Sequence, residues 1–393
     1  MNLDAVVPPF IDIPYQKADS MARKYNFNRE SLKYKIFALG FLFFMLIQVA
    51  LSVFSVIILK TGAKPLYRYA SFKILKECTL VVSCSDENFK ETASSLPLNF
   101  FWAISWWSML LSRTWQILLA KSLGKTVVMF PNSVGPFRTS VGKFLAKLAL
   151  NNCEFVLIRE PISFNIVKSL GIHSNIILTA DTALLFKSSA NYLHNEFSGP
   201  RVGVCPGIYG HSLSKKEVDR YIRAHAQALD DCIEKYGLKV FFLPHFVMGF
   251  FHDDLQICKQ IFARMKNANS AEIIYEPTAE KFKSMLDTMD MVISSKMHPA
   301  ILAASGYVPV LCIVYDHKQT GFFQNLGMTN CILDIRKLSY KILSCKIDYV
   351  WNKRKLLSAS LRNQIPQLQE NVRLAIKKAI AFSLTDLEQK SND

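Results

Sequence analysis

Residues 291–314 read MVISSKMHPAILAASGYVPVLCIV, two apolar runs on either side of a short helical pattern. Met291–Ser294 and Val308–Val314 predict buried strands, and Pro299–Ala304 between them predicts a helix. A strand, a helix and a second strand in this order form the βαβ unit of a parallel sheet. The residues Ser-Lys-Met-His, 295–298, separate the first strand from the helix, at the edge of the sheet where ligands bind.

The same alternation of strand and helix patterns runs through the chain from about residue 78. A polar break at Ser188–Pro200 divides it into two halves. The sequence therefore predicts an α/β fold with two Rossmann-like domains facing a cleft, residues 78–190 and 198–393, after an atypical N-terminal region 1–77. The other expected strands are Thr79–Ser83, Lys125–Phe130, Phe155–Ile158, Asn175–Leu178, Val202–Cys205, Lys239–Leu243 and Glu272–Tyr275.

Charge and composition narrow the possible partners. The chain has 393 residues, of which 50% are hydrophobic and 20% charged, and its formal net charge is +16. Nucleic acid, an anionic membrane surface or a multiply anionic substrate would each account for the positive charge. The sequence has no zinc-finger spacing and no aromatic RNA-binding motif, so we expect no nucleic acid partner. The nine cysteines include no Cys-x-x-Cys pair, which predicts small buried side chains in a reducing compartment rather than a metal site.

The N-terminal region holds one long apolar segment. Ile36–Leu59 has no charged residue, and Lys33, Lys35, Lys60 and Lys64 flank it on both sides. About 20 apolar residues cross the hydrocarbon core of a bilayer as a helix. Cations on both flanks give no inside–outside asymmetry, so a spanning helix, an interfacial segment and a buried domain helix remain open. We expect membrane contact through residues 36–59.

Polar residues that follow the strands are the candidates for chemistry, because ligands bind at the carboxyl ends of parallel strands. Arg159 follows one expected strand, Asp181 another and His245 a third. Lys296 and His298 precede a helix whose N-terminal amides favour an anion. Each alone has a structural interpretation, such as a helix cap for Asp181 or a satisfied surface histidine. Together they describe a cleft site for a small polyanion that carries carboxylate and phosphate.

Four segments of the chain resemble, in order and spacing, the polysaccharide pyruvyl transferases: MFPNSVGPF, VLIREPIS, TADTALLF and VISSKMHPAILAASGYVPVLCIVYDHKQTG. The resemblance covers about residues 78–328, and no single motif carries it alone. It implies two Rossmann-like domains arranged as in GT-B glycosyltransferases and phosphoenolpyruvate as the donor substrate. Fixed cations can hold the donor's anionic groups, so the chemistry requires no metal and no cofactor.

Two of the family's motifs carry over with single changes. Arg159 matches the arginine of an Arg-Asp-x-x-Ser segment, and Glu160 replaces its aspartate. His298 matches the histidine of an Arg-x-His segment, and Lys296 stands in place of its arginine. Lysine keeps the charge but loses the bidentate fork of arginine. The resemblance implies that Arg159 and Lys296 bind the donor anion and that His298 contacts phosphate or transfers a proton.

The other motifs match in part. In the family's Gln-Ser-x-Gly-Pro loop, Asn132 replaces glutamine whereas Ser133 and Gly135 match. Only Asp86 agrees with the family's glycine-rich loop, and the family's opening Asn-x-Gly-Asp turn has only residues 1–4 as a counterpart. We expect catalytic or acceptor-positioning roles for His298, Asp181 and Asp86. The expected substrate-binding residues are Arg159, Lys296, Met297, Ser133, Gly135, His245 and Lys318.

The expected activity moves the pyruvyl (enolpyruvyl) group of phosphoenolpyruvate onto a hydroxyl pair of a sugar, forming a pyruvate ketal. The acceptor would be a cell-surface polysaccharide or a lipid-linked glycan precursor, and the expected location is cytoplasmic and membrane-associated. Two alternatives remain. A GT-B glycosyltransferase using a nucleotide-sugar would share the fold, and a non-catalytic membrane-bound scaffold in glycan assembly would explain the altered loops. Arg159 and His298 favour an enzyme over the scaffold.

Overall fold

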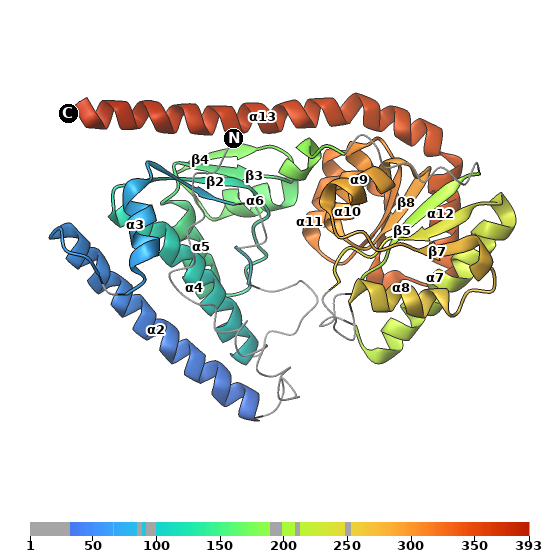
Figure 1. Cartoon of the computed structure of the whole chain (residues 1–393), viewed down its shortest axis with the longest axis horizontal. Coiled ribbons are helices and arrows are strands. Elements are labelled where there is room, and N and C mark those ends of the chain that lie inside the picture. The colour runs from blue at the N-terminus through green and yellow to red at the C-terminus, as the bar shows by residue number, and fades with distance from the viewer. Residues whose placement is uncertain are drawn as a thin grey trace. The chain divides into compact units, whose positions relative to one another are not determined.

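The structure is a computed structural model that describes residues 32–65, 67–84, 89–91, 100–188, 199–208, 213–247 and 253–392. It divides into two compact units, each built on a parallel sheet, so the predicted pair of α/β domains is confirmed (Figure 1). Most of the expected break at Ser188–Pro200 lies outside the described residues. Unit 1 comprises Met1–Arg159, Ser163–Thr179 and Arg373–Asp393, and unit 2 comprises Glu160–Ile162 and Ala180–Val372.

Unit 1 has a four-stranded sheet of order β1-β2-β3-β4, with every pair parallel. Helices connect the strands, as the short turns between apolar runs predict. The strands are β1 (Leu80–Ser83), β2 (Thr126–Asn132), β3 (Phe155–Ile158) and β4 (Asn175–Leu178). The helices are α2 (Leu32–Lys60), α3 (Tyr69–Glu77), α4 (Phe100–Ser122), α5 (Ser140–Leu150) and α6 (Pro161–Ser169).

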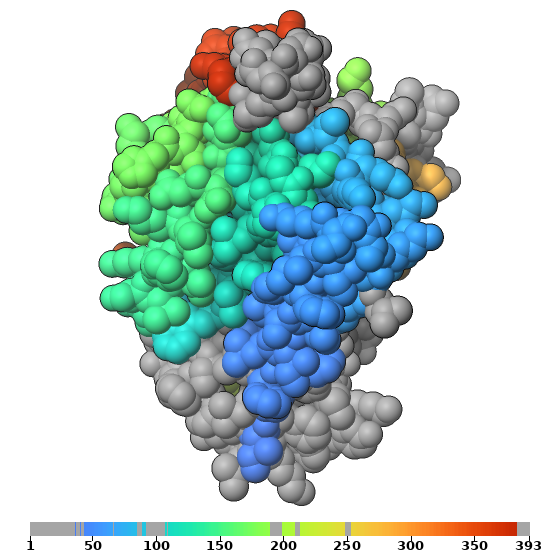
Figure 2. Space-filling model, turned by 90° about the vertical axis from the view of Figure 1, so that its left-hand side faces the viewer, coloured from blue at the N-terminus to red at the C-terminus, as the bar shows by residue number. Residues whose placement is uncertain are grey.

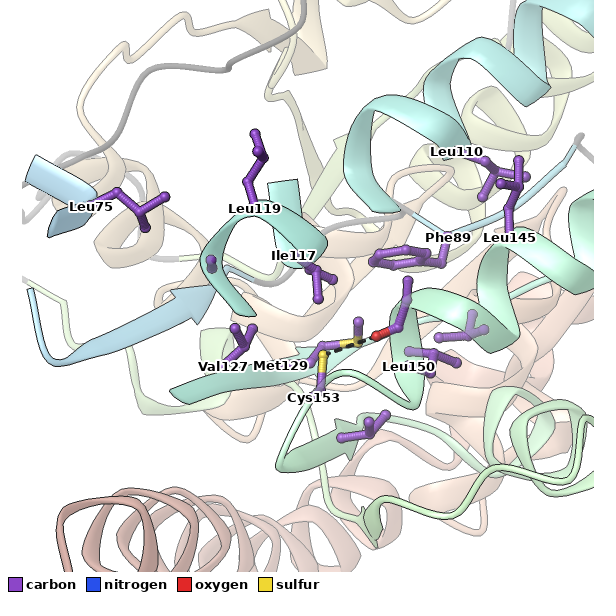
Figure 3. Close-up of a cluster of buried hydrophobic side chains, with 14 of the residues drawn as sticks. Leu75, Phe89, Leu110, Ile117, Leu119, Val127, Met129, Leu145, Leu150 and Cys153 are labelled. Carbon is purple, nitrogen blue, oxygen red and sulfur yellow. Dashed lines mark hydrogen bonds between the residues drawn. The ribbon is translucent and has the colours of Figure 1, made fainter. Parts of the chain in front are cut away.

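Side chains of β2 fill the core on both faces of this sheet, because successive residues of a strand point to opposite sides. Val127 and Met129 face the cluster formed with α4 and α5, and Figure 3 shows Ile117 of α4 pointing toward them. Cys153 belongs to the same cluster, and its thiol donates to the Ala149 carbonyl at 3.6 Å. Between Val127 and Met129, Val128 faces the other side, where it packs with Ala375 and Ala379.

Those two alanines belong to the last helix, α13 (Arg354–Asn392), and they explain a difference from the sequence-based domain boundaries. The sequence predicts one domain over residues 198–393. In the structure, α13 belongs to unit 2 as far as Val372 and to unit 1 from Arg373 onward. Small side chains such as Ala375 and Ala379 let the helix approach the sheet of unit 1 closely, and both are buried there.

Helix α2 covers part of unit 1 and packs on α4. Met45, Val56 and Leu59 on its inner side belong to the hydrophobic core of the unit. The indole Nε1 of Trp115 in α4 donates to Ser52 Oγ at 2.7 Å. Within the described residues, this is the one helix long and apolar enough to cross a membrane, by length and composition alone.

Unit 2 has a six-stranded parallel sheet of order β10-β9-β8-β5-β6-β7. Its strands are β5 (Arg201–Cys205), β6 (Lys239–Phe242), β7 (Ala271–Ile273), β8 (Met291–Ser294), β9 (Val310–Val314) and β10 (Ile332–Asp334). From β5 the chain proceeds outward through β6 and β7, and from β8 it proceeds the opposite way through β9 and β10. The order therefore reverses between β5 and β8, which makes their carboxyl ends the topological switch point where doubly wound sheets bind ligands.

Six helices and the first part of α13 surround this sheet. Helix α7 begins at a capping box in which Ser214 and Glu217 satisfy each other's backbone amides, and it ends at Gly237 with φ of 61°. The first six are α7 (Lys215–Tyr236), α8 (Asp254–Phe262), α9 (Ala279–Asp287), α10 (Met297–Ser305), α11 (His317–Asn325) and α12 (Tyr340–Asn352). Helices α8 and α10 begin beside the carboxyl ends of β6 and β8, and they supply the polar groups of the site.

Candidate active site

Lys296 lies at the switch point of the unit 2 sheet, directly after β8. Its side chain crosses the loop that follows the neighbouring strand β5, because a Cβ on Gly207 would lie 2.1 Å from Lys296 Cε. A glycine is therefore required at position 207 for the lysine to keep this path. The Lys296 ammonium reaches Asp254 Oδ1 at 3.0 Å and lies 5.5 Å from the centre of the Phe246 ring.

Asp254 is the buried partner that holds this lysine. Only 1% of its side chain is exposed, against 19% for Lys296. Its second oxygen, Oδ2, accepts from the Phe246 amide at 2.8 Å, which ties the pair to the loop after β6. Burial raises the pKa of Asp254 above its ordinary value, while the charge of Lys296 acts in the opposite direction. The lysine is thus oriented by a carboxylate that exposes almost none of its own charge to solvent.

The first turn of α10 adds backbone donors beside Lys296. Lys296 occupies the N-cap position, and its own side chain makes no capping hydrogen bond to the helix. Met297 and His298 follow, and their amides have no carbonyl of an earlier helical turn to bond to, whereas Pro299 has no amide hydrogen. Two amides, a cation and the positive end of the helix dipole therefore meet at one point. Such a point favours a carboxylate or phosphate.

Side chains from two other helices fix the turn between β8 and α10. Tyr221 of α7 places its hydroxyl 2.6 Å from Ser295 Oγ and accepts from the Gly207 amide at 3.2 Å. Gln319 of α11 donates to the Ser295 carbonyl at 3.2 Å. Ser294 Oγ donates to the Lys296 carbonyl and accepts from its amide, at 2.8 and 3.0 Å. The turn is thereby held before any ligand arrives, which lowers the entropic cost of binding.

Two histidines lie next to this turn. The rings of His245, after β6, and His298 have centroids 6.4 Å apart. The His245 side chain is partly exposed, yet the protein surrounding the rest of its ring lowers its pKa to about 4, with the charges of His298 and Lys296 acting in the same direction. His245 is therefore neutral at pH 7 and can accept a hydrogen bond or a proton. The structure brings together four predicted residues in unit 2: His245, Lys296, Met297 and His298.

A second polar group follows β9, where the chain enters α11. His317 lies between two buried carboxylates, with Nδ1 2.7 Å from Asp316 Oδ1 and Nε2 3.7 Å from Glu160 Oε1. Glu160 also accepts from the Ile162 amide at 2.8 Å. Lys318, which the sequence analysis proposed for substrate binding, is buried in the first turn of α11. His317 lies three residues after the end of β9, so the same positional rule that selected His298 could have selected it.

Asp181 has a structural role that the sequence analysis weighed against a catalytic one. Its Oδ1 accepts from the Ala183 amide at 2.9 Å and caps the short 3₁₀ helix Thr182–Leu185. That turn packs against α10. A side chain in a cap is held in one orientation, so Asp181 supports the element that carries His298. Its predicted catalytic role stays a prediction.

In unit 1, Arg159 follows β3 and is almost fully buried. Its Nε donates to Ser133 Oγ at 2.7 Å, so two predicted substrate-binding residues lie in contact. The loop that holds Ser133 is tight: Ser163 Oγ accepts from the Val134 amide at 2.8 Å, and Gly135 has φ of 82°. A Cβ on Gly135 would lie 2.9 Å from the side chain of Ile166, so only glycine fits there.

Two further polar groups at the strand ends of unit 1 have unusual surroundings. Asn132 ends β2 and Thr179 follows β4, and both are buried. Among the described residues, neither the side-chain amide of Asn132 nor the hydroxyl of Thr179 has a hydrogen-bond partner. A buried polar group without a partner costs about 1–3 kcal/mol, and such groups often mark functional sites. Both lie at the sheet edge where the fold predicts ligands.

Glu91, which the sequence did not indicate as a functional residue, holds the segment that follows Ser133 and Gly135. Glu91 is fully buried, accepts from the indole of Trp107 at 2.8 Å and from the Thr139 amide at 2.7 Å, and bonds to the Thr139 hydroxyl. No local signal marks it, because its partners are distant in sequence. Asp86, a predicted catalytic residue, lies outside the described residues. Among the residues that the structure describes, no group of three or more His, Cys, Asp or Glu side chains could hold a metal ion.

The model of the family described as "Polysaccharide pyruvyl transferase" matches residues 9–317. The chain is 22% identical over 251 residues to "Amylovoran biosynthesis protein AmsJ" of Erwinia amylovora. That match covers 59% of each protein, so the chain spans less than two thirds of this relative.

Three solved structures with the same fold are 10–11% identical to the chain, so they inform the fold alone. A putative UDP-N-acetylglucosamine 2-epimerase from Listeria monocytogenes has a TM-score of 0.53 over 85% of this chain and 80% of its own. S. aureus MnaA, solved with UDP, has a TM-score of 0.53 over 83% and 86%. The UDP-GlcNAc 2-epimerase from Neisseria meningitidis has a TM-score of 0.50 over 93% and 88%. These neighbours have the GT-B fold, which agrees with the predicted fold class.

Proposed function

The chain belongs to the polysaccharide pyruvyl transferase family, and from that premise we propose that it uses phosphoenolpyruvate as donor and forms a pyruvate ketal on a sugar. The acceptor is a hydroxyl pair of a cell-surface polysaccharide or of a lipid-linked glycan precursor. One observation carries the proposal: Lys296 and the start of α10, which the Lys296 side chain does not cap, meet at the switch point of the unit 2 sheet. This is a site for a small anion, next to an exposed histidine.

In the proposed complex, phosphoenolpyruvate binds through both of its anionic groups. The Lys296 ammonium and the amides of Met297 and His298 supply charge and directed donors for one group. Arg159, oriented by Ser133, supplies a guanidinium that suits a carboxylate or phosphate. The neutral imidazole of His245 next to His298 is suited to a hydrogen bond with a donor hydroxyl or to accepting a proton.

The chemistry moves two hydroxyl protons of the sugar: the equivalent of one enters at the methylene carbon of phosphoenolpyruvate, and the other leaves with the phosphate. A proton added to the methylene carbon of phosphoenolpyruvate turns it into a methyl group and leaves an oxocarbenium-like centre at the neighbouring carbon. A first sugar hydroxyl attacks that carbon and loses its proton, and the bond to phosphate then breaks. A second hydroxyl attacks the same carbon, loses its proton and closes the ketal ring. We assign proton transfer or phosphate contact to His298, whose exposed ring suits either task.

The remaining predicted residues serve the acceptor in this proposal. Asp181 and Asp86 are candidates for positioning the sugar or for accepting its protons. Asp181 also caps a turn that packs on α10, so its loss would disturb the donor site as well. Membrane contact through residues 36–59 belongs to the proposal too, because lipid-linked acceptors present their sugars at a membrane surface and the donor is a cytosolic metabolite.

The direct test incubates purified protein with phosphoenolpyruvate and candidate lipid-linked glycans. We expect a glycan mass increase equal to one carboxyethylidene group, with one phosphate released for each ketal formed. Lys296→Ala should reduce both signals, whereas Lys235→Ala removes an exposed lysine of α7 and is a matched control.

Two results would contradict the proposal. One is phosphate release without glycan modification, since that describes a phosphatase. The other is transfer from a nucleotide-sugar with no dependence on phosphoenolpyruvate, which would establish the glycosyltransferase alternative.

A further inference from the structure

Helix α2 has the opposite polarity to an ordinary surface helix. From Phe43 to Leu59 its polar residues are Gln48, Ser52 and Ser55, and all three are buried against unit 1. At 100° per residue they share one side of the helix with Met45, Val56 and Leu59. An amphipathic helix of a water-soluble protein turns its polar side outward. In α2 the outward side is the apolar one.

The outward side of α2 is a large, continuous apolar face, and no residue that the structure describes covers it. Phe43, Phe54 and Ile57 are 67%, 61% and 55% exposed. In the view of Figure 2, α2 runs in blue across the surface of unit 1. A contiguous apolar surface of this kind marks an interaction site. The exposed large apolar side chains of the helix are Ile36, Phe43, Phe44, Leu46, Ile47, Leu51, Val53, Phe54 and Ile57.

The contacts on the inward side of α2 argue against an arrangement in which lipid surrounds the helix on all sides. Ser52 accepts a hydrogen bond from Trp115 at 2.7 Å, and Met45, Val56 and Leu59 share one core with Leu110 and Ile117 of α4. These contacts run along the helix from residue 45 to residue 59. A spanning helix would have to leave this core or draw the charged surface of unit 1 into the hydrocarbon region, and both are costly.

Charge at the end of the helix identifies the kind of surface that it contacts. Lys60 ends α2 and Lys64 follows it, and both are exposed. The chain as a whole carries a net charge of +16. Lysines at the border of an apolar helix face suit the anionic headgroups of a bilayer.

We propose that α2 lies flat on one leaflet of an anionic membrane, with its outward face in the acyl region and its inner face kept on unit 1. The protein is then monotopic: both ends of α2 stay on the same side of the membrane. This defines the mode of the membrane contact proposed above, and it does not depend on which reaction the protein catalyses.

The first test is flotation with phosphatidylcholine vesicles, with and without phosphatidylglycerol. We expect the full-length protein to float with both and more strongly with the anionic ones. Phe43→Ser combined with Phe54→Ser should weaken binding about a hundredfold, about tenfold for each large apolar side chain withdrawn from the bilayer. The matched control replaces Leu356 and Leu374 of α13 by serine, because these side chains are 67% and 55% exposed, close to the 67% and 61% of Phe43 and Phe54. Equal loss in both double variants would overturn the proposal.

A second test needs no variant with a weakened helix. A lipid with a photoreactive acyl chain should label the unsubstituted protein in peptides from residues 43–57. In membrane vesicles of both orientations, an N-terminal tag and the exposed thiol of Cys345 should be reached from the same side. Tag and thiol on opposite sides would establish a spanning helix. Failure to float, with a dimer that shields α2 from solvent, would show instead that a second copy covers this face.

Discussion

The Lys296 ammonium lies 3.0 Å from Oδ1 of Asp254, whose carboxylate is 1% exposed. The pair joins the end of β8 to the start of α8, two elements that are separate in sequence and adjacent at the sheet edge. A lysine on a flexible four-carbon stem has many orientations, and a buried partner selects one of them. Asp254 therefore positions a cation that the proposed donor needs, without contacting the donor itself.

Asp254→Asn should weaken phosphoenolpyruvate binding through Lys296. Asparagine can still accept from the Phe246 amide at Oδ, so the fold keeps that bond and loses only the ion pair. We expect a decrease of about tenfold in donor affinity, against about ten- to a hundredfold for Lys296→Ala. The double variant should bind no more weakly than Lys296→Ala alone, because the two residues act as one unit. Isothermal titration with phosphoenolpyruvate measures all three.

A second ion pair in unit 2 provides the control for that series. Asp287 contacts the buried Lys283 within α9, away from the switch point. Asp287→Asn should change the free energy of unfolding and leave the affinity for phosphoenolpyruvate unchanged. If the effects of Asp254→Asn and Lys296→Ala add independently, Asp254 does not act through the lysine.

Gly207→Ala should displace Lys296 without changing any charge. The added Cβ would lie 2.1 Å from Lys296 Cε, and the lysine end is flexible enough to swing away. We therefore expect donor affinity close to that of Lys296→Ala, in a protein with nearly unchanged thermal stability. Gly40→Ala is the matched control, since nothing lies within 4 Å of a Cβ there. Full donor affinity in Gly207→Ala would mean that the position of the lysine is unimportant.

The strand-end residues of unit 2 could be predicted from sequence because they depend on one local rule. A buried apolar run followed by polar residues and a helical pattern locates a ligand edge, and Lys296 and His298 fit it directly. His317 fits the same rule, since it begins α11 after β9. The alternation of strands also predicted two parallel sheets, which the structure confirms.

The partners of those residues could not be predicted. Asp254, Tyr221 and Glu91 act through side-chain contacts with residues far away in sequence, and no periodicity reports such contacts. The division of α13 between the units has the same origin. Its helical pattern is continuous, and only packing on the sheet of unit 1 distinguishes the part after Arg373. Likewise, the apolar segment predicted membrane contact. Its inverted polarity could be recognised only from the structure, which shows that Ser52 and Ser55 are buried.

Asn132→Leu should stabilise the protein and lower its activity. The buried amide has no partner among the described residues, and leucine has a similar shape without polar atoms. We expect the free energy of unfolding to rise by about 1 kcal/mol in urea denaturation, while pyruvyl transfer falls. Asn152→Leu is the matched control with the opposite sign, because that amide donates to the Leu148 carbonyl at 2.7 Å. A destabilised Asn132→Leu protein would show that the amide makes an essential bond.

His225 should make unit 2 sensitive to acid. Its ring is buried, Nδ1 lies 2.8 Å from the Tyr221 carbonyl, and Nε2 has no partner among the described residues. Burial lowers its pKa to about 4, whereas the carbonyl contact acts in the opposite direction. In the unfolded chain a histidine has a pKa of about 6.5, so between these values the unfolded state binds more protons. Stability contributed by neutral His225 is therefore complete above pH 6.5 and is lost as the pH falls toward 4.

The size of that effect follows from the shift. Each pH unit in this window changes the free energy of unfolding by at most about 1.4 kcal/mol, which gives about 3 kcal/mol at pH 4. The ring centroids of His225 and Tyr221 are 4.1 Å apart. His225→Phe keeps a ring against Tyr221 and removes the group that titrates. At pH 8 the difference between the two proteins measures the packing change alone. Below pH 6.5 the variant should lose less stability than the parent. The contributions of His245 and Asp254 to the pH dependence cancel in this comparison, because both proteins contain these residues. Parallel stability curves from pH 8 to pH 4 would mean that His225 is protonated as readily in the folded protein as in the unfolded one.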